Sequence, residues 1–237
     1  MIDLYAMGSP NVVKIYLALE EMGLPYTVKP LDVFGGGQFK EEFLKLNPNA
    51  KVPVIVDSDG PGGKPYTVFE SGAILLYLAE KTGKCLPKDP AARCDAIQWM
   101  MVQMTQLGPM FGQYVHFWRF APKGNDYSLD RYRTQVIRVL DVLERRLAQV
   151  PYLGGAEYSI ADIATWPWAR NVGMYLGKET AAKYPKLMAW VAKIDERPAA
   201  KATLPRIDAV RAQTTQFDKA PPDMMDKLFG RGAYKAA

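Results

Sequence analysis

The residues with the clearest chemical potential lie between positions 47 and 78, in the stretch NPNAKVPVIVDSDGPGGKPYTVFESGAILLYL. Glu70 and Ser71 precede an apolar helical run, and the unpaired N–H groups and positive dipole of a helix start favour a bound carboxylate. Pro53 opens a β-branched strand and is a candidate for a cis peptide bond, which would hold the backbone of Val52 outward for pairing with an extended peptide. The stretch therefore predicts a site for an anion and a peptide.

A second group of polar residues stands in the turn Met7-Gly8-Ser9-Pro10-Asn11, directly before an amphipathic helix. A hydroxyl and a side-chain amide at this position can cap the helix. The same groups can instead donate hydrogen bonds to an anion beside the helix start. From the residues alone both interpretations stay open for Ser9 and Asn11.

The elements that would carry these residues change in character along the chain. Residues 1–83 predict the order βαβαββα of a thioredoxin-like domain, with a parallel strand pair from the first βαβ unit and an antiparallel hairpin around Val54 and Val68. Helical periodicity takes over afterwards. We therefore predict an α/β plus all-α protein with a linker at 84–91, a helical domain at 92–204 and a tail at 205–237 that either crosses back over the protein or is disordered.

The helical half offers candidates for a second pocket. Gly108-Pro109 should kink or break a methionine-rich helix, and the aromatic segment after it contains the chain's one histidine, His116, which has no nucleophile to pair with. Four residues in this region either line a pocket for a second substrate or simply pack in the core, and the sequence leaves both interpretations open: Met104, Phe111, His116 and Trp118. Ser159 and Asp162 form a capping box, so Asp162 is kept out of the catalytic set.

Composition narrows the possible partners. The 237 residues are 49% hydrophobic and 23% charged, and the net charge of +5 comes from Lys and Arg spread along the chain rather than clustered, so we expect no nucleic-acid partner. There is no run of 18 apolar residues and no basic leader, from which we expect a cytoplasmic protein without a membrane span. Cys85 and Cys94 have neither C-x-x-C spacing nor a histidine cluster, so no dithiol and no metal site is expected.

The motifs together resemble a known family. M-I-D-L-Y, the S-P-N turn, G-G-Q-F, N-P-N-x-K-V-P and F-E-S-G-A-I-L-L-Y-L-A-E-K-T-G are similar to the glutathione S-transferase superfamily, most closely its bacterial nu class, and the yeast nitrogen-regulatory prion protein has a similar domain. The resemblance implies a homodimer that uses glutathione as a substrate to reduce disulfides without a protein cysteine. Some transferases use an N-terminal tyrosine, but Tyr5 lies inside the first strand and is better explained as a strand residue.

The resemblance also implies a role for each matching residue. Asn11, with Ser9 where the class commonly has threonine, would face the glutathione sulfur, because a thiol needs donors beside it to react as the thiolate. The residues that would hold the rest of glutathione are Gln38 and Lys51 at the glycyl end, Val52 with Pro53 at the cysteinyl unit, Glu70 with Ser71 at the γ-glutamyl group, and Arg131. For Arg131 a solvated helix position is equally compatible with the sequence.

Three functions follow, in order of preference. The first is glutathione-dependent reduction of small or protein disulfides, through a mixed disulfide that a second thiol resolves. The second is conjugation of glutathione to small electrophiles, which needs the apolar pocket near Met104, Phe111 and Trp118. The third is a non-catalytic regulatory or binding module. The intact set of glutathione residues argues against this third function.

Overall fold

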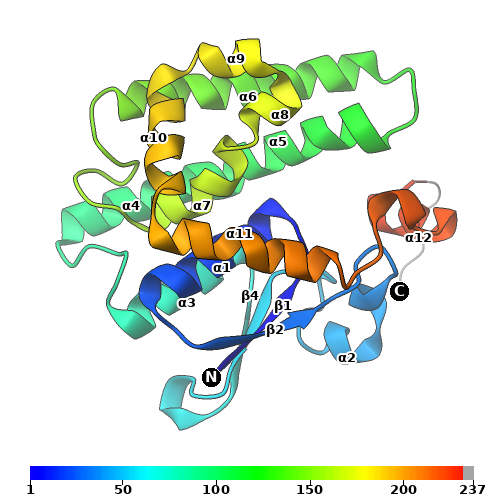
Figure 1. Ribbon diagram of the computed structural model, residues 1–237, viewed down its shortest axis with the longest axis horizontal. Helices are drawn as coiled ribbons and strands as arrows, with labels where there is room; N and C mark the ends of the chain where they lie inside the picture. Colours follow the sequence, from blue (N-terminus) through cyan, green and yellow to red (C-terminus); the bar gives the residue numbers. More distant parts are fainter. Residues whose placement is uncertain (232–237) are drawn as a thin grey trace.

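The computed structural model describes residues 1–231 and shows an α/β domain against which a larger helical domain packs (Figure 1). The elements of the first domain are β1 (Ile2–Ala6), α1 (Pro10–Met22), β2 (Tyr26–Pro30), the 3-10 turn η1 (Gly37–Phe39), α2 (Glu41–Leu44), β3 (Val54–Asp57), the 3-10 turn η2 (Pro61–Gly63), β4 (Tyr66–Phe69) and α3 (Ser71–Thr82). This is the predicted βαβαββα order, so the fold class read from the sequence is confirmed.

The four strands form one mixed sheet in the order β2-β1-β3-β4. β1 pairs in parallel with β2, from Ile2 opposite Tyr26 to Ala6 opposite Pro30. β3 runs antiparallel to both β1 and β4. The parallel pair and the hairpin expected around Val54 and Val68 are thus both present, and the hairpin brings the end of β4 beside the start of β3.

Helix α1 is the central element of the molecule. It packs against α3 of its own domain and against the helical domain's α7 and α11. Every residue from Val12 to Leu19 is buried, including Lys14. A helix that is buried on all sides must be apolar all round, which explains the near-continuous apolar sequence of this segment.

The second domain is entirely helical in the described residues. Its elements are α4 (Pro90–Val102), the π-helical turn η3 (Gln103–Leu107), α5 (Gly108–Val115), the π-helical turn η4 (His116–Phe120), α6 (Asp126–Leu147), α7 (Ile160–Ala169), α8 (Val172–Leu176), α9 (Lys178–Ala182) and α10 (Pro185–Asp195). The capping box at α7 is present, with Ser159 and Asp162 bonded reciprocally.

Of the kink or break expected at Gly108-Pro109, the break does not occur, and the irregularity takes the form of a π turn directly before Gly108. The chain stays helical from Pro90 to Phe120, and the π turn η3 ends immediately before α5, in which Pro109 occupies the first turn. Proline is tolerated there because its missing N–H falls where the regular hydrogen-bond pattern is already interrupted. The sequence shows the irregularity but not the continuity of the helix across it.

The C-terminal segment crosses back over the first domain. Helix α11 (Pro198–Arg211) spans residue 204, at which the sequence analysis ended the helical domain, and it is followed by the 3-10 turn η5 (Phe217–Lys219) and α12 (Pro222–Phe229) (Figure 1). Thr215 bonds to Asp32 through its N–H and its hydroxyl, at 3.0 and 2.7 Å. Up to residue 231 the chain follows the first of the two alternatives left open for the tail, and residues 232–237 lie outside the described part.

Aromatic rings fix this segment between the two domains. The ring of Phe217 meets those of Phe34 and Phe120, with centroids 5.9 and 4.7 Å away, and Phe229 stacks on Phe120 at 4.5 Å. Phe34 belongs to the first domain and Phe120 to the second, so the rings of the C-terminal segment connect both.

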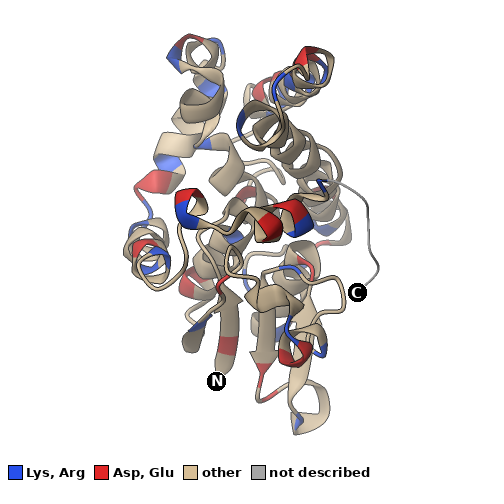
Figure 2. Cartoon of the chain, turned by 90° about the vertical axis from the view of Figure 1, so that its right-hand side faces the viewer, with Lys and Arg blue, Asp and Glu red and all other residues tan. Residues whose placement is uncertain are grey.

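Lys and Arg residues and Asp and Glu residues are interspersed along the ribbon of both domains (Figure 2). No helix in residues 1–231 has the length and apolarity needed to cross a membrane.

Candidate functional site

A small cavity, here called the peptide cleft, opens at the meeting point of α1, the loop before β3 and the start of α3. Its lining consists of Asn11, Asn47, Lys51, Val52, Pro53, Glu70 and Ser71. All of these except Asn47 were singled out as ligand-binding residues from the sequence. The fold thus brings three segments that are far apart in the chain to one place.

The loop before β3 presents its backbone to the cleft. Asn47, 1% exposed, donates from Nδ2 to the carbonyl oxygen of Lys51 at 2.8 Å and accepts from the N–H of Asn49 at 3.0 Å. The Val52–Pro53 peptide bond is cis, as the sequence predicts. Among the described residues neither the N–H nor the C=O of Val52 has a hydrogen-bond partner, so this residue can pair with an extended peptide.

The start of α3 forms the opposite wall. Glu70 holds a φ of 69°, which is rare for a residue with a side chain, and its carboxylate does not cap the helix. The carboxylate is therefore available to a ligand ammonium. Ser71 is the first helical residue, so its hydroxyl and the adjoining backbone N–H groups suit a ligand carboxylate.

Asn11 is held in a defined orientation by the helical domain. The indole Nε1 of Trp168 donates to Asn11 Oδ1 at 3.2 Å. Because the indole N–H can only donate, Oδ1 must face Trp168, and the amide Nδ2–H₂ group is left as a donor toward the cleft. Neither Ser9 nor Asn11 makes a side-chain capping bond to α1.

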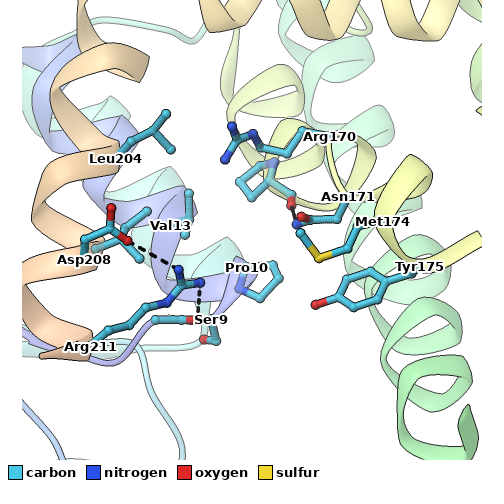
Figure 3. A pocket seen from close by; sticks show the side chains of 13 residues that line it. Ser9, Pro10, Val13, Arg170, Asn171, Met174, Tyr175, Leu204, Asp208 and Arg211 are labelled. Atoms are coloured by element: carbon cyan, nitrogen blue, oxygen red, sulfur yellow. Dashed lines mark hydrogen bonds and ion pairs between the residues drawn. The ribbon is translucent and has the colours of Figure 1, made fainter. Parts of the chain in front are cut away.

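Ser9 lies on the other side of the α1 start, in a cavity of about 280 Å³, here called the second cavity (Figure 3). The wall from α11 carries Asp208 and Arg211, and the facing wall carries Arg170, Asn171 and Tyr175. The full lining is Gly8, Ser9, Pro10, Val13, Pro167, Arg170, Asn171, Met174, Tyr175, Leu204, Ile207, Asp208 and Arg211. Ser9 and Asn11 therefore face different cavities.

Two arginines give the second cavity a positive character. Arg211 is 3.4 Å from Asp208 and donates to the carbonyl oxygen of Gly8 at 3.5 Å. Arg170 lies 3.7 Å from Asp195 and stacks over the ring of Trp166. Both contacts with carboxylates are long, which leaves guanidinium donors for a carboxylate-bearing ligand.

The four residues expected to line a second-substrate pocket line neither cavity. Phe111 is fully buried against Trp168 and Tyr175, while Met104 lies beneath Ser71 with its Sδ 3.7 Å from the hydroxyl. His116 contacts Phe229 of the C-terminal segment, and Trp118 is 49% exposed. Burial, together with the charge of Arg231, lowers the pKa of His116.

Three further candidates also lie outside the two cavities. Gln38 is fully buried, and neither atom of its amide has a partner in the described residues. Arg131 is exposed near the start of α6. Tyr5 is a strand residue whose ring packs on Phe43, in agreement with the interpretation preferred from the sequence.

Two residues near the cleft were missed by the sequence reasoning. Asn47 braces the loop, and its place in the N-P-N motif was a usable signal. Lys14 is 1% exposed and donates to Ser71 Oγ at 3.2 Å. The usable signal for Lys14 was a charged residue within the apolar run Val12 to Leu19.

The protein's own thiols lie elsewhere. Cys85 and Cys94 are both free and line neither cavity. Burial raises the pKa of Cys85 to about 11, so its thiol is a poor nucleophile. In residues 1–231 no group of three His, Cys, Asp or Glu side chains is placed to hold a metal ion.

Family comparisons agree with this geometry. The model of the glutathione S-transferase N-terminal domain matches residues 8–81 and that of the C-terminal domain matches residues 126–193. The chain is 47% identical to disulfide-bond oxidoreductase YfcG of Escherichia coli over 84% of its own length and 92% of that protein. It is 38% identical to disulfide-bond oxidoreductase YghU of the same organism, over 84% of this chain and 73% of the relative.

Solved structures give the same result. A glutathione transferase family member from Pseudomonas fluorescens with two glutathiones bound is 42% identical, with a TM-score of 0.81 over 86% of this chain and 92% of its own. A glutathione transferase from Pseudomonas putida with one glutathione disulfide bound per subunit is also 42% identical, with a TM-score of 0.81 over 86% and 90% of the two chains. The chain belongs to the glutathione S-transferase family.

Proposed function

We propose that this protein is a glutathione-dependent disulfide oxidoreductase. The observation that carries the proposal is the Asn11 amide, which Trp168 orients as a donor at the cleft that joins the loop backbone of Val52 to the start of α3. No cysteine lines that cleft, so the reactive sulfur is that of the ligand. The two relatives named as disulfide-bond oxidoreductases support the reaction class.

Each part of glutathione finds a complementary group. The γ-glutamyl ammonium suits the free carboxylate of Glu70, and the γ-glutamyl carboxylate suits the Ser71 hydroxyl and the N–H groups at the start of α3. The cysteinyl unit pairs with the backbone of Val52. Lys51, whose Nζ donates to Asn49 Oδ1 at 3.2 Å, binds the glycyl carboxylate.

The reaction is two thiol–disulfide exchanges. Glutathione loses its thiol proton and the thiolate attacks one sulfur of the substrate disulfide, which forms a mixed disulfide and releases one substrate thiolate. A second glutathione, likewise deprotonated, attacks the glutathione sulfur of this mixed disulfide and releases the other half of the substrate as a thiolate. The two substrate thiolates take up the two protons that the glutathiones lost. Two glutathiones are oxidised to glutathione disulfide and the substrate disulfide is reduced to two thiols. Asn11 Nδ2–H₂ stabilises the attacking thiolate.

We further propose that the second cavity receives the disulfide substrate. It adjoins the same helix start as the peptide cleft, and Arg170 and Arg211 suit substrates with carboxylates. The pocket of Met104, Phe111, His116 and Trp118, together with contacts of Gln38 and Arg131 to glutathione, stays a prediction. The homodimer and the cytoplasmic location stay predictions as well.

The decisive experiment measures two activities side by side. Reduction of bis(2-hydroxyethyl) disulfide by glutathione is coupled to glutathione reductase and NADPH, and conjugation of glutathione to an activated aryl halide is measured in parallel. Strong reduction with weak conjugation is expected. Dominant conjugation would replace the proposed reaction with transfer to electrophiles, and glutathione binding without either activity would make the protein a binding module.

A further inference from the structure

Lys14 is a charged side chain that the proposed chemistry does not use. It lies in the second turn of α1, three residues after Asn11, and is 1% exposed. Its Nζ donates to Gln103 Oε1 at 2.7 Å and to Ser71 Oγ at 3.2 Å, and Met104 Sδ lies at 3.7 Å. No carboxylate within residues 1–231 forms an ion pair with it.

An ammonium buried without a carboxylate partner is costly. Burial lowers the pKa of Lys14 to about 7, against the opposing influence of Glu70. Replacing the lysine with an apolar residue would remove this cost, so a stabilising role in the free protein does not explain it. A negative charge that arrives with a ligand does.

The surroundings of Lys14 are built around its head group. Gln103 and Met104 are consecutive residues of the π turn η3, and both reach Nζ. Gly108 makes room for this arrangement, since a Cβ at that position would lie 2.8 Å from Gln103 Nε2. The third contact, Ser71, lines the peptide cleft. Lys14 therefore reaches the ligand site through one hydroxyl.

We propose that Lys14 is a positioning residue whose charge, transmitted through Ser71, balances the γ-glutamyl carboxylate of bound glutathione, so that Lys14 takes up a proton when glutathione binds. This inference rests on the proposed glutathione site and names a group that acts beneath it.

The state of Lys14 decides where the Ser71 hydroxyl points. A charged Lys14 can only donate to Ser71 Oγ, so the Ser71 O–H is free to donate to a carboxylate in the cleft. A neutral Lys14 has a lone pair that accepts the Ser71 O–H and turns it away from the ligand. A bound carboxylate favours the charged form and raises the pKa of Lys14.

Other titratable groups near α1 are engaged elsewhere. Glu70, directly before α3, is the charged group that raises the pKa of Lys14 against burial, and η3 contributes the neutral side chains of Gln103 and Met104. Asp162 of α7 accepts from Trp190 and backbone N–H groups, and Arg206 of α11 pairs with Glu20. Ligand affinity should therefore be highest below about pH 7 and fall as the pH rises through the pKa of Lys14 in the free protein.

The test uses S-methylglutathione, which has no thiol proton, in titration calorimetry between pH 6 and pH 8. Experiments in two buffers of different ionisation enthalpy give the number of protons taken up. The wild-type protein should bind less tightly at pH 8 than at pH 6 and take up part of a proton near pH 7.5. Lys14→Met should bind about 10-fold more weakly at pH 6, with no proton uptake and a flat pH profile.

A second ligand isolates the carboxylate. S-methylated 4-aminobutyryl-cysteinylglycine lacks only the γ-glutamyl carboxylate, so wild type and Lys14→Met should bind it equally at every pH. Lys183→Met, an exposed lysine on the helical domain, is the matched control and should behave as wild type.

The outcomes separate the two proposals. If wild type binds S-methylglutathione without proton uptake, or if Lys14→Met keeps the wild-type affinity and pH profile, the role of Lys14 is overturned and the glutathione site stands. If wild type does not bind S-methylglutathione at all, the proposed function falls and this inference with it. Should Lys14→Met fail to fold, proton uptake by the wild-type protein decides.

Discussion

The two cavities beside the start of α1 are assembled in different ways. The peptide cleft is built from two short pieces of chain, 47–53 and 70–71, together with Asn11. The second cavity is built from the start of α1 with the turn before it, and from the end of α7 with α8 and α11, which follow more than half of the chain later. The first combines backbone groups with side chains from short local segments, and the second presents side chains from helices that are distant in the sequence.

This difference separates two tasks. In the proposed site, the backbone of Val52 beside the cis peptide bond would pair with the peptide backbone of glutathione, and Glu70 with the start of α3 would bind its γ-glutamyl charges. Side chains from three helices can change without disturbing that recognition. Variants of the cleft should therefore alter the kinetics toward glutathione, and variants of the second cavity should alter the kinetics toward the disulfide.

The largest effect on disulfide reduction is expected from loss of Asn11, the proposed donor to the glutathione sulfur. Asn11→Ala removes the donor to the thiolate and should lower kcat/KM for disulfide reduction about 100-fold, because a lost donor to a reacting anion has an effect of this order. Steady-state kinetics measure the loss, and calorimetry with glutathione should show retained binding. Trp168→Phe, which keeps a ring but frees Asn11 Oδ1, should give a smaller loss. Unchanged turnover in Asn11→Ala would remove it from the mechanism.

The next effect concerns glutathione binding. Glu70→Gln replaces the carboxylate that faces the γ-glutamyl ammonium and should raise the KM for glutathione about 10-fold or more, as expected for a hydrogen bond to a charged group. The KM for the disulfide should not change. Asp3→Asn is the control, because it also removes a carboxylate, at a partly exposed position of β1 where Asp3 forms an ion pair with Lys29. Equal shifts in both KM values would contradict the division between the cavities.

A smaller effect is expected on the other side of α1. Arg170→Gln should raise the KM for 4,4′-dithiodibenzoate about 3-fold, since the guanidinium is partly exposed and such charges contribute little. The KM for bis(2-hydroxyethyl) disulfide, which is neutral, and the KM for glutathione should stay the same. If both disulfides respond alike, the second cavity does not select carboxylates.

No effect is expected when the cysteines are removed. Cys85→Ala with Cys94→Ala should leave the specific reductase activity unchanged, because neither thiol lines a cavity and burial raises the pKa of Cys85 to about 11. The coupled assay at saturating glutathione measures this, with a melting curve to correct for folded fraction. A large loss would make a protein thiol part of the reaction.

The same contrast explains what the sequence predicts. The order of elements in the first domain, α1 and the peptide cleft follow from signals that are local: alternation, a proline before a strand, and Glu70-Ser71 before a helix. Lys51, Val52 and Ser71 could be assigned to one cleft because neighbours in the sequence determine their geometry, while their roles toward glutathione stay predictions. Asn11 could be assigned too, although its orienting partner Trp168 lies 157 residues away.

The second cavity could not be predicted from the sequence, and the reason is physical. Arg170, Asn171 and Arg211 come together only when α7, α8 and α11 pack around α1, and periodicity gives the faces of helices but not their partners. Phe111 shows the same limit. An aromatic residue on an apolar helix gives the same sequence pattern whether it lines a pocket or packs in the core, and in this structure Phe111 is fully buried.

The burial of α1 on every side has a consequence for synthesis of the chain. Its apolar surface is covered by α3 within the first domain, but also by α7 and α11, which leave the ribosome much later. The α/β domain emerges before the helical domain and has a complete strand order, yet it exposes part of α1 until α11 has been made. Folding of this domain should therefore be completed only after α11 has left the ribosome, and chaperones that bind apolar segments should recognise the nascent chain through α1.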